Sequence, residues 1–399
     1  MTKRHPSFER IALILQGGGA LGAYQAGVYQ ALAEEGLHPG WVAGISIGAI
    51  NSALIAGNPP EKRVDALRDF WQSITTAHPA HPAYMLRFLG LDKAEMIAWN
   101  ETVHGWANQM NAVATVLGGA PEFFKPRTLH PLLAPKGTDS AQSFYDVSPL
   151  RSTLERLVDF DRINSGEMRF SVGAVNVRNG NFTYFDTTTH TIRPEHIMAS
   201  GALPPGFPAV EIDGEAYWDG GLVSNTPLQW VLENKPRRDT LAFQVDLWSA
   251  MGEFPGDLIS QDLRLKDIRF SSRTRYATTQ FRNQQRLRRA LARMIEDMPD
   301  VALLGKDDAG IEALISEADE KVYNIIHLIY RAKNYEGSCK DYEFSAVTMQ
   351  EHWDSGYADA VETLKHKEVW QRPETPDGVA TFDIHDHEPQ LRTRRARRR

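Results

Sequence analysis

Three short segments carry residue types that could perform acyl-transfer chemistry, and the first contains a serine. Ser46 stands in the run Gly44-Ile45-Ser46-Ile47-Gly48, between an apolar stretch and one rich in alanine and isoleucine. A serine on a sharp strand-to-helix turn exposes its hydroxyl, and glycines two positions before and after it remove side chains that would clash. The following helix N-terminus supplies free amides for a developing oxyanion. Ser46 is therefore the candidate nucleophile.

The second segment is a glycine cluster that directly follows the apolar run from Ile11 to Leu15. Its sequence is Gly17-Gly18-Gly19-Ala20-Leu21-Gly22. The pattern G-x-G-x-x-G is also typical of dinucleotide-binding oxidoreductases, but that use needs a second strand that ends in an acidic residue. Here the second expected strand leads into Ser46 instead. We expect the loop amides to form an oxyanion hole beside Ser46, and the oxidoreductase remains a less favoured alternative.

The third segment is Asp219-Gly220-Gly221, which follows the short expected strand from Glu215 to Trp218. A carboxylate at a strand end, followed by glycines, can approach a serine hydroxyl closely because neighbouring side chains are absent. Such a group can take the serine proton and return it to the leaving group. Asp219 is therefore the candidate general base.

In this order and on these elements, the three motifs resemble those of the patatin-like phospholipase family. The glycine loop, the G-x-S-x-G turn and the D-G-G match residues 17–22, 44–48 and 219–221. The runs from Ser200 to Pro205 and from Asn225 to Pro227 look like flanking features of the family. The resemblance covers residues 8–255, and the part after it resembles a C-terminal extension found in a bacterial subset of patatin-like proteins.

The resemblance implies a lipid acyl hydrolase with a Ser46–Asp219 dyad, an acyl-enzyme intermediate, and neither a metal nor a cofactor. It implies a three-layer α/β/α fold with a mostly parallel central sheet, followed by a largely helical extension. The candidate oxyanion donors are the backbone amides of Gly17, Gly18, Gly19 and Ile47. The glycines that support the motifs are Gly22, Gly44, Gly48, Gly220 and Gly221.

Other enzymatic and non-enzymatic alternatives stay open at this point. His327 and His352 follow Asp219 in the chain order of a Ser-Asp-His triad. The same dyad would serve an esterase or thioesterase that acts on soluble acyl compounds or a storage polyester. A catalytically silent scaffold is disfavoured because all three chemical parts are intact.

The elements that position these residues read as an α/β protein. Strand, helix, strand and helix alternate within the first 57 residues, which indicates βαβ units. A strand from Met168 to Asn176 is expected to form a hairpin through Asn179-Gly180. Leu241 to Leu247 reads as the last strand of the core, and a helix is expected from Lys321 to Lys333.

The expected organisation is a catalytic domain over residues 8–255, an extension over 256–385, and a basic disordered tail over 386–399. An insertion at about 78–145 interrupts the catalytic domain, and its segment from Met85 to Phe124 could form a lid, an acyl-chain wall or an extra layer of core. The basic stretch from Arg264 to Arg293 could bind anionic headgroups, be a solvated helix face, or pair with acids of the same chain.

Composition sets broader limits on the class of protein. The 399 residues are 42% hydrophobic and 24% charged, as is ordinary for a globular protein with a sizeable core. The net charge of -7 argues against nucleic acid as a partner, and the single cysteine, Cys339, suits a reducing compartment. The apolar runs are too short for a signal peptide or a membrane span. We expect a cytoplasmic protein whose partner is a lipid or acyl-ester substrate, with at most peripheral membrane contact.

Overall fold

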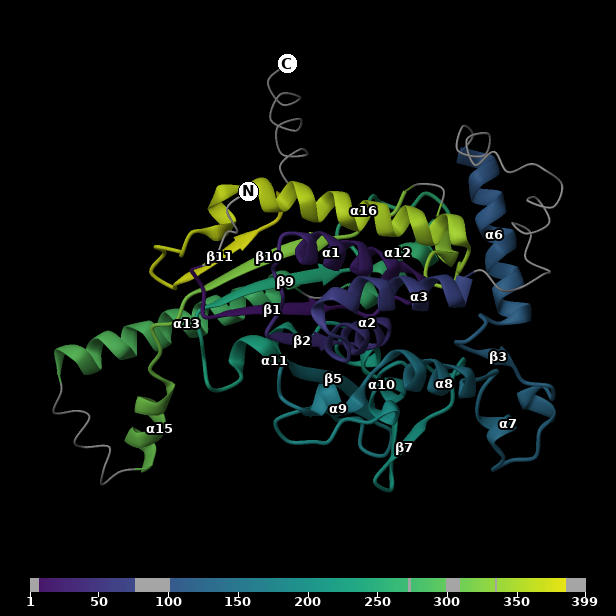
Figure 1. The fold of residues 1–399 in the computed structure, drawn as a ribbon, viewed down its shortest axis with the longest axis horizontal. Helices are drawn as coiled ribbons and strands as arrows, with labels where there is room; N and C mark the ends of the chain where they lie inside the picture. Colours follow the sequence, from purple (N-terminus) through teal and green to yellow (C-terminus); the bar gives the residue numbers. More distant parts are fainter. Residues whose placement is uncertain (1–6, 76–100, 272–273, 299–308, 334–335, 385–399) are drawn as a thin grey trace, which may run out of the picture.

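The fold is built on a nine-stranded sheet, seen here in a computed structural model that describes residues 7–75, 101–271, 274–298, 309–333 and 336–384 (Figure 1). The strand order is β11-β10-β9-β1-β2-β5-β8-β7, and β6 also pairs with β5. The strands from β11 through β5 are parallel, whereas β6, β7 and β8 pair antiparallel with their neighbours. The bounds are β1 Arg10–Leu15, β2 Trp41–Gly44, β5 Arg169–Asn176, β6 Phe182–Asp186, β7 Val210–Ile212, β8 Glu215–Asp219, β9 Thr240–Asp246, β10 Tyr323–Ile329 and β11 Val379–Phe382.

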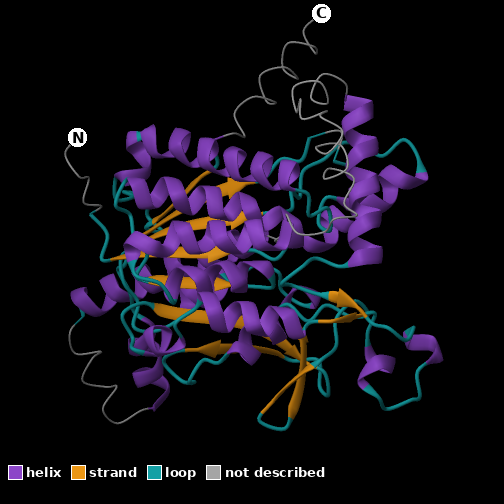
Figure 2. Cartoon of the chain, turned by 45° about the vertical axis from the view of Figure 1, so that its right-hand side comes forward, coloured by secondary structure: helices purple, strands orange, loops and turns teal. Residues whose placement is uncertain are grey.

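Helices cover both faces of the sheet, which confirms the predicted three-layer α/β architecture (Figure 2). The longer helices are α1 Ala23–Glu34, α2 Ile47–Ala56, α3 Arg63–Thr75, α6 Glu101–Gly118, α8 Ser148–Leu157, α12 Leu258–Phe270, α13 Thr274–Asp297, α15 Ala309–Glu317 and α16 Ala346–Lys365. Shorter helices are α7 Asp139–Gln142, α9 Phe160–Asn164, α10 Pro194–Ser200 and α11 Leu228–Glu233. A separate ribbon pairs β3 Lys125–Pro126 with β4 Tyr145–Asp146.

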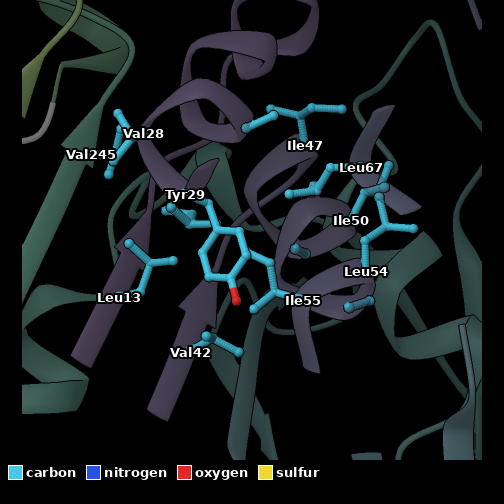
Figure 3. Close-up of a cluster of buried hydrophobic side chains, with 14 of the residues drawn as sticks. Leu13, Val28, Tyr29, Val42, Ile47, Ile50, Leu54, Ile55, Leu67 and Val245 are labelled. Carbon is cyan, nitrogen blue, oxygen red and sulfur yellow. The ribbon is translucent and has the colours of Figure 1, made fainter. Parts of the chain in front are cut away.

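Successive side chains of β1 point to opposite faces of the sheet. Leu13 and Leu15 point to the face covered by α1, α2, α3 and α16, whereas Ala12 and Ile14 pack against α11 and α13. Figure 3 shows the first of these layers, where Val42 of β2 and Val245 of β9 meet side chains of α1 and α2. A parallel strand buried on both faces needs apolar side chains in both directions, which explains the uninterrupted run of β1.

The C-terminal part belongs to the same sheet, and this corrects two expectations. The predicted helix from Lys321 to Lys333 is wrong: Tyr323–Ile329 is strand β10, which pairs in parallel with β9. The strand β9 is therefore an interior strand and not the last of the core. A short apolar run gives no clear periodicity, and pairing with a distant strand decided its conformation. The expected helical character of the extension is confirmed by α12, α13, α15 and α16.

Two glycines let the C-terminal helix α16 lie against α1. A Cβ on Gly27 of α1 would overlap the backbone at Trp353, and a Cβ on Gly356 of α16 would overlap the backbone at Tyr24. The Tyr24 hydroxyl also donates to Asp359 of α16 at 2.7 Å. The first helix after the glycine loop is thus packed against a helix that lies more than 300 residues later in the chain.

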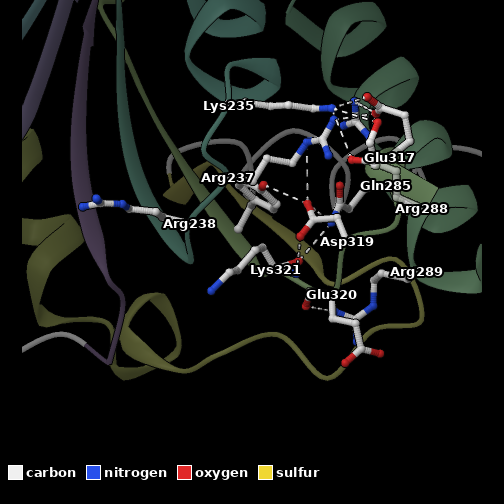
Figure 4. A network of polar contacts seen from close by, with 12 residues as sticks. Lys235, Arg237, Arg238, Gln285, Arg288, Arg289, Glu317, Asp319, Glu320 and Lys321 are labelled. Atoms are coloured by element: carbon white, nitrogen blue, oxygen red, sulfur yellow. Dashed lines mark hydrogen bonds and ion pairs between the residues drawn. The ribbon is translucent and has the colours of Figure 1, made fainter. Parts of the chain in front are cut away.

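Part of the basic stretch pairs with acids of the same chain. Arg288 of α13 contacts Glu317 at 3.1 Å, and Glu317 also binds Lys235 at 2.9 Å (Figure 4). Arg282 contacts Asp377 at 2.8 Å. These contacts favour the intrachain alternative for this part of the stretch.

Two predicted segments lie partly or wholly outside the described residues. The tail at 386–399 is outside them, and the insertion is described only from Glu101 onward. In the described part of the insertion, Phe123 and Phe124 are buried and pack with Phe207 and Phe344, so they form a layer of core. Helix α6 instead exposes Trp106 and Leu117. No helix within the described ranges is long and apolar enough to cross a bilayer.

Candidate active site

Ser46 occupies a strained turn between β2 and α2. Its backbone has φ 54° and ψ -122°, a conformation that residues other than glycine rarely adopt. Gly44 and Gly48 make the turn compact, because a Cβ on Gly44 would overlap the carbonyl of Gly48 and a Cβ on Gly48 would overlap that of Leu15. The predicted glycine requirement of this turn therefore has a steric cause. The Ser46 side chain is left partly exposed at the carboxyl edge of the sheet.

A second serine, Ser200, connects this turn to strand β5. The amide of Ser46 donates to the Ser200 hydroxyl at 3.0 Å, and that hydroxyl donates to the carbonyl of Gly173 in β5 at 2.7 Å. Ser200 is fully buried at the end of α10. Sequence reasoning noticed Ser200 only as the start of a flanking run and missed this contact. The available signal was a small polar residue at the end of a helix, followed by a glycine.

Asp219 is the last residue of β8, and its side chain lies next to Ser46. The amide of Gly221 donates to its carboxylate at 2.7 Å, and the Ser46 side chain lies near enough to lower the pKa of Asp219 as a hydrogen-bond donor. The following Gly220 lies so close to β5 that a Cβ would be 2.6 Å from the carbonyl of Gly173. The pairing of β8 with β5, which is itself next to β2, thus brings together the two predicted residues.

The environment of Asp219 favours a proton acceptor that titrates near neutral pH. Its side chain is buried, and this loss of solvent raises the pKa of Asp219 to about 7, although the hydrogen bonds from Ser46 and Gly221 oppose the shift. A base is most effective when its pKa lies near the working pH. The carboxylate is therefore a stronger base than an exposed aspartate would be.

The glycine loop has one anchored residue and two free ones. The amide of Gly17 donates to the carbonyl of Asn225 at 3.3 Å, so its proposal as an oxyanion donor is withdrawn. The carbonyl of Gly17 accepts from Asn225 and from the indole of Trp248, both at 3.0 Å. Gly18 and Gly19 are partly exposed, and no acceptor within the described ranges binds their amides.

Ile47 offers a third free amide. It is the first residue of α2, a position whose N–H has no partner inside the helix. Across the part of the chain that the structure describes, no acceptor outside the helix binds the Ile47 amide either. Among the described residues, the amides of Gly18, Gly19 and Ile47 thus have no hydrogen-bond acceptor.

Gln16 ties the glycine loop to the end of β9. Its side-chain oxygen accepts from the amides of Leu247 and Trp248 at 2.6 and 2.9 Å, and its side-chain nitrogen donates to Thr226 at 3.1 Å. Gln16 is fully buried. Sequence reasoning missed this residue, although a polar side chain directly after an apolar strand was a visible signal.

The two histidines of the alternative triad have other neighbours. His352 lies 3.5 Å from Glu336 and 3.4 Å from the carbonyl of Ala20. His327 lies in β10, which β9 and β1 separate from β2. Among the described residues, the groups that interact with the Asp219 carboxylate are Ser46 and the amide of Gly221, and no histidine is one of them.

A serine elbow at the edge of an α/β sheet, beside a carboxylate and free amides, is the arrangement of a serine hydrolase. Comparison with known families gives the particular group. The family described as "Patatin-like phospholipase" matches residues 13–232, and one described as "Patatin phospholipase" matches residues 268–376. The first match spans more than half of the sequence, and the chain belongs to the patatin-like phospholipase family, whose members are lipid ester hydrolases.

Single proteins give weaker comparisons. No curated protein matches the chain. Among solved structures, it is similar to the crystal structure of VipD from Legionella pneumophila, with 15% identity and a TM-score of 0.39. That alignment covers 98% of this chain and 74% of the other. A similarity of this size supports no further conclusion.

Proposed function

We propose that this chain is a lipid acyl hydrolase in which Ser46 is the nucleophile and Asp219 the general base, without a histidine. The observation that carries the proposal is the interaction of the Ser46 side chain with the buried carboxylate of Asp219, next to a loop and a helix start whose amides at Gly18, Gly19 and Ile47 have no acceptor among the described residues. Acyl transfer needs a nucleophile beside its base and donors for the oxyanion, and these residues supply both kinds of group.

In the first half of the reaction, the Ser46 oxygen attacks the ester carbonyl while its proton passes to Asp219. The carbonyl oxygen becomes an oxyanion, which the amides of Gly18, Gly19 and Ile47 stabilise. Collapse of this intermediate breaks the ester bond, and Asp219 returns the proton to the departing alcohol. The acyl group is left on Ser46.

In the second half, Asp219 takes a proton from water as the water attacks the acyl-enzyme. The same amides hold the second oxyanion. When the bond to Ser46 breaks, the proton returns to the serine oxygen and the carboxylic acid leaves. No step needs a second titratable group, because one carboxylate acts alternately as base and acid.

The proposal is tested by acid-quenching the protein during turnover of a phospholipid and analysing its peptides by mass spectrometry. We expect the acyl group on the peptide that contains Ser46, and release of fatty acid that Ser46→Ala abolishes. Fatty-acid release by Ser46→Ala at the wild-type rate would contradict the proposal.

A parallel assay distinguishes the alternative of a soluble-ester hydrolase. A phospholipid in vesicles and a short-chain ester in solution are compared as substrates for the same preparation. A lipid acyl hydrolase should have the higher kcat/KM on the phospholipid. A higher value on the short-chain ester, with no turnover of the vesicles, would favour the esterase or thioesterase.

A further inference from the structure

The C-terminal part of the chain contacts the outer side of the glycine loop. The amide of Ala20 donates to the carbonyl of Asp341 at 2.8 Å. Gly19 has φ +56°, and a Cβ there would overlap the same carbonyl. The free amides of Gly18 and Gly19 are therefore next to a contact made by a residue more than 300 positions later in the sequence.

Two reciprocal ion pairs hold the segment around Asp341 against α12. Lys266 of α12 pairs with Asp341, and the adjacent Asp267 pairs with Lys340 at 2.7 Å. We call Lys266, Asp267, Lys340 and Asp341 the charge clamp. The side chain of Lys340 is 5% exposed and that of Asp267 17%, so solvent screens this pair less than it would an exposed pair.

The charge clamp also contacts the inner anchor of the loop. The ammonium groups of Lys266 and Lys340 lie 5.7 and 4.9 Å from the centre of the Trp248 ring. The indole of Trp248 in turn donates to the carbonyl of Gly17 at 3.0 Å. The charge clamp thus connects to the loop on both sides of the free amides, through Gly17 and through Ala20.

A loop of three glycines has no side chains with which to hold its own conformation. Oxyanion donors must lie within hydrogen-bonding distance of the reacting oxygen, and a misplacement of about 1 Å can cost about 100-fold in rate. The anchors at Gly17 and Ala20 leave only Gly18 and Gly19 between them. Contacts from outside the loop are therefore needed to aim these amides.

We propose that the charge clamp is a positioning device for the oxyanion amides, so that the C-terminal part of the chain contributes to catalysis without touching the substrate. This inference rests on the proposed function of Ser46 and the loop. The four residues of the charge clamp are positioning residues, since they act on the loop through the Ala20 amide, which donates to the backbone carbonyl of Asp341, and through the Trp248 ring. It predicts that breaking the charge clamp weakens binding of the transition state more than binding of the substrate.

Charge reversal tests the proposal in the full chain. Lys340→Asp and Asp267→Lys each place like charges opposite one another, and the double variant restores an opposite pair. We expect each single variant to lower kcat by about tenfold or more with little change in KM. The double variant should regain most of the loss. A double variant no better than the poorer single variant would overturn the proposal.

Ligand affinity separates positioning from general damage to the fold. A long-chain trifluoromethyl ketone adds to the serine and presents an oxyanion, whereas an ether analogue of the phospholipid resembles only the substrate. The single variants should bind the ketone about tenfold more weakly or worse, and the ether as wild type does. Equal loss of affinity for both ligands, or no loss for the ketone, would overturn the proposal.

A matched control and a milder variant complete the design. Lys321→Asp breaks the ion pair with Glu9 at 2.8 Å, just before the first residue of β10. This control variant should leave ketone affinity unchanged. If a reversal variant does not fold, Lys340→Met and Asp341→Asn are measured in its place with the same expected pattern. A wild-type protein that does not bind the ketone would contradict the proposed function itself. Binding by wild type and equally by the variants would contradict only the role of the charge clamp.

Discussion

The Ser46 side chain interacts with the Asp219 carboxylate although Ser46 follows β2 and Asp219 ends β8, two strands that are not neighbours in the sheet. Between β2 and β8 lies β5, whose Gly173 carbonyl receives the Ser200 hydroxyl that in turn holds the Ser46 amide. The geometry of the candidate dyad therefore depends on β5 and α10 as much as on the two residues themselves.

The first prediction concerns the pH dependence of activity. Burial raises the pKa of Asp219 to about 7, and only the ionised carboxylate can take the serine proton. We expect kcat/KM to rise with pH through a single ionisation near 7 and then to level off. A pH profile measured with a neutral substrate tests this. A profile that is flat from pH 5 to pH 8 would mean that no group titrating near 7 controls the reaction.

The second prediction concerns stability. The folded-state pKa of Asp219 is raised from 3.8 to about 7, so between these pH values the folded protein keeps a proton that the unfolded chain has lost. The contribution of Asp219 to stability therefore falls as pH rises through this window and is constant above it. We expect Asp219→Asn to be more stable than wild type at pH 8, by at most about 4 kcal/mol, with no such gain at pH 4.

Urea unfolding of both proteins at the two pH values measures this difference. The control is Asp213→Asn, an exposed aspartate on a turn, which should show no gain of comparable size at pH 8. An Asp219→Asn protein less stable than wild type at pH 8 would show that hydrogen bonds of the carboxylate outweigh the cost of its burial.

The third prediction concerns Ser200. Ser200→Ala removes the acceptor for the Ser46 amide and the donor to Gly173, both in a buried position. Leaving buried polar groups unsatisfied costs about 1–3 kcal/mol of stability. We expect that loss in chemical unfolding, with a lower kcat because the serine turn is less firmly held. Ser165→Ala, whose hydroxyl bonds locally on the surface, is the control.

The features that could be predicted are those that a short stretch of sequence determines by itself. Glycines around Ser46 and after Asp219 mark close backbone approach, and the apolar run of β1 marks a buried parallel strand, so these motifs are readable from the sequence. The roles of Gln16 and Ser200 are set by partners distant in the sequence, Leu247 and Gly173. The local sequence marks both residues as unusual polar positions, but it does not identify their partners.

Contacts between residues distant in the sequence also explain why the expectations for Gly17 and for the run that forms β10 differ from the structure. Gly17 is a glycine like its neighbours, but Asn225 takes its amide, a contact that only the folded chain creates. The run that forms β10 is short and apolar, and such a run fits a helix or a buried strand equally well. Its pairing with β9 decided the outcome.

The fourth prediction concerns the alternative triad. His327→Gln should retain wild-type activity, because β10 is separated from the serine strand by two others. Loss of a general base would cost about 100-fold or more. Steady-state kinetics of the purified variant decide the matter, and a loss of that size would restore histidine to the mechanism.

The central claim, that Asp219 activates Ser46, is tested most directly by the rate at which a fluorophosphonate labels the serine at pH 8 in wild type and Asp219→Asn. A general base contributes about 10²- to 10⁴-fold, and we expect labelling of the variant to be slower by a factor in that range. Ser46→Ala should show no label at all. Labelling of Asp219→Asn at the wild-type rate would contradict the role of Asp219, even with the label on Ser46.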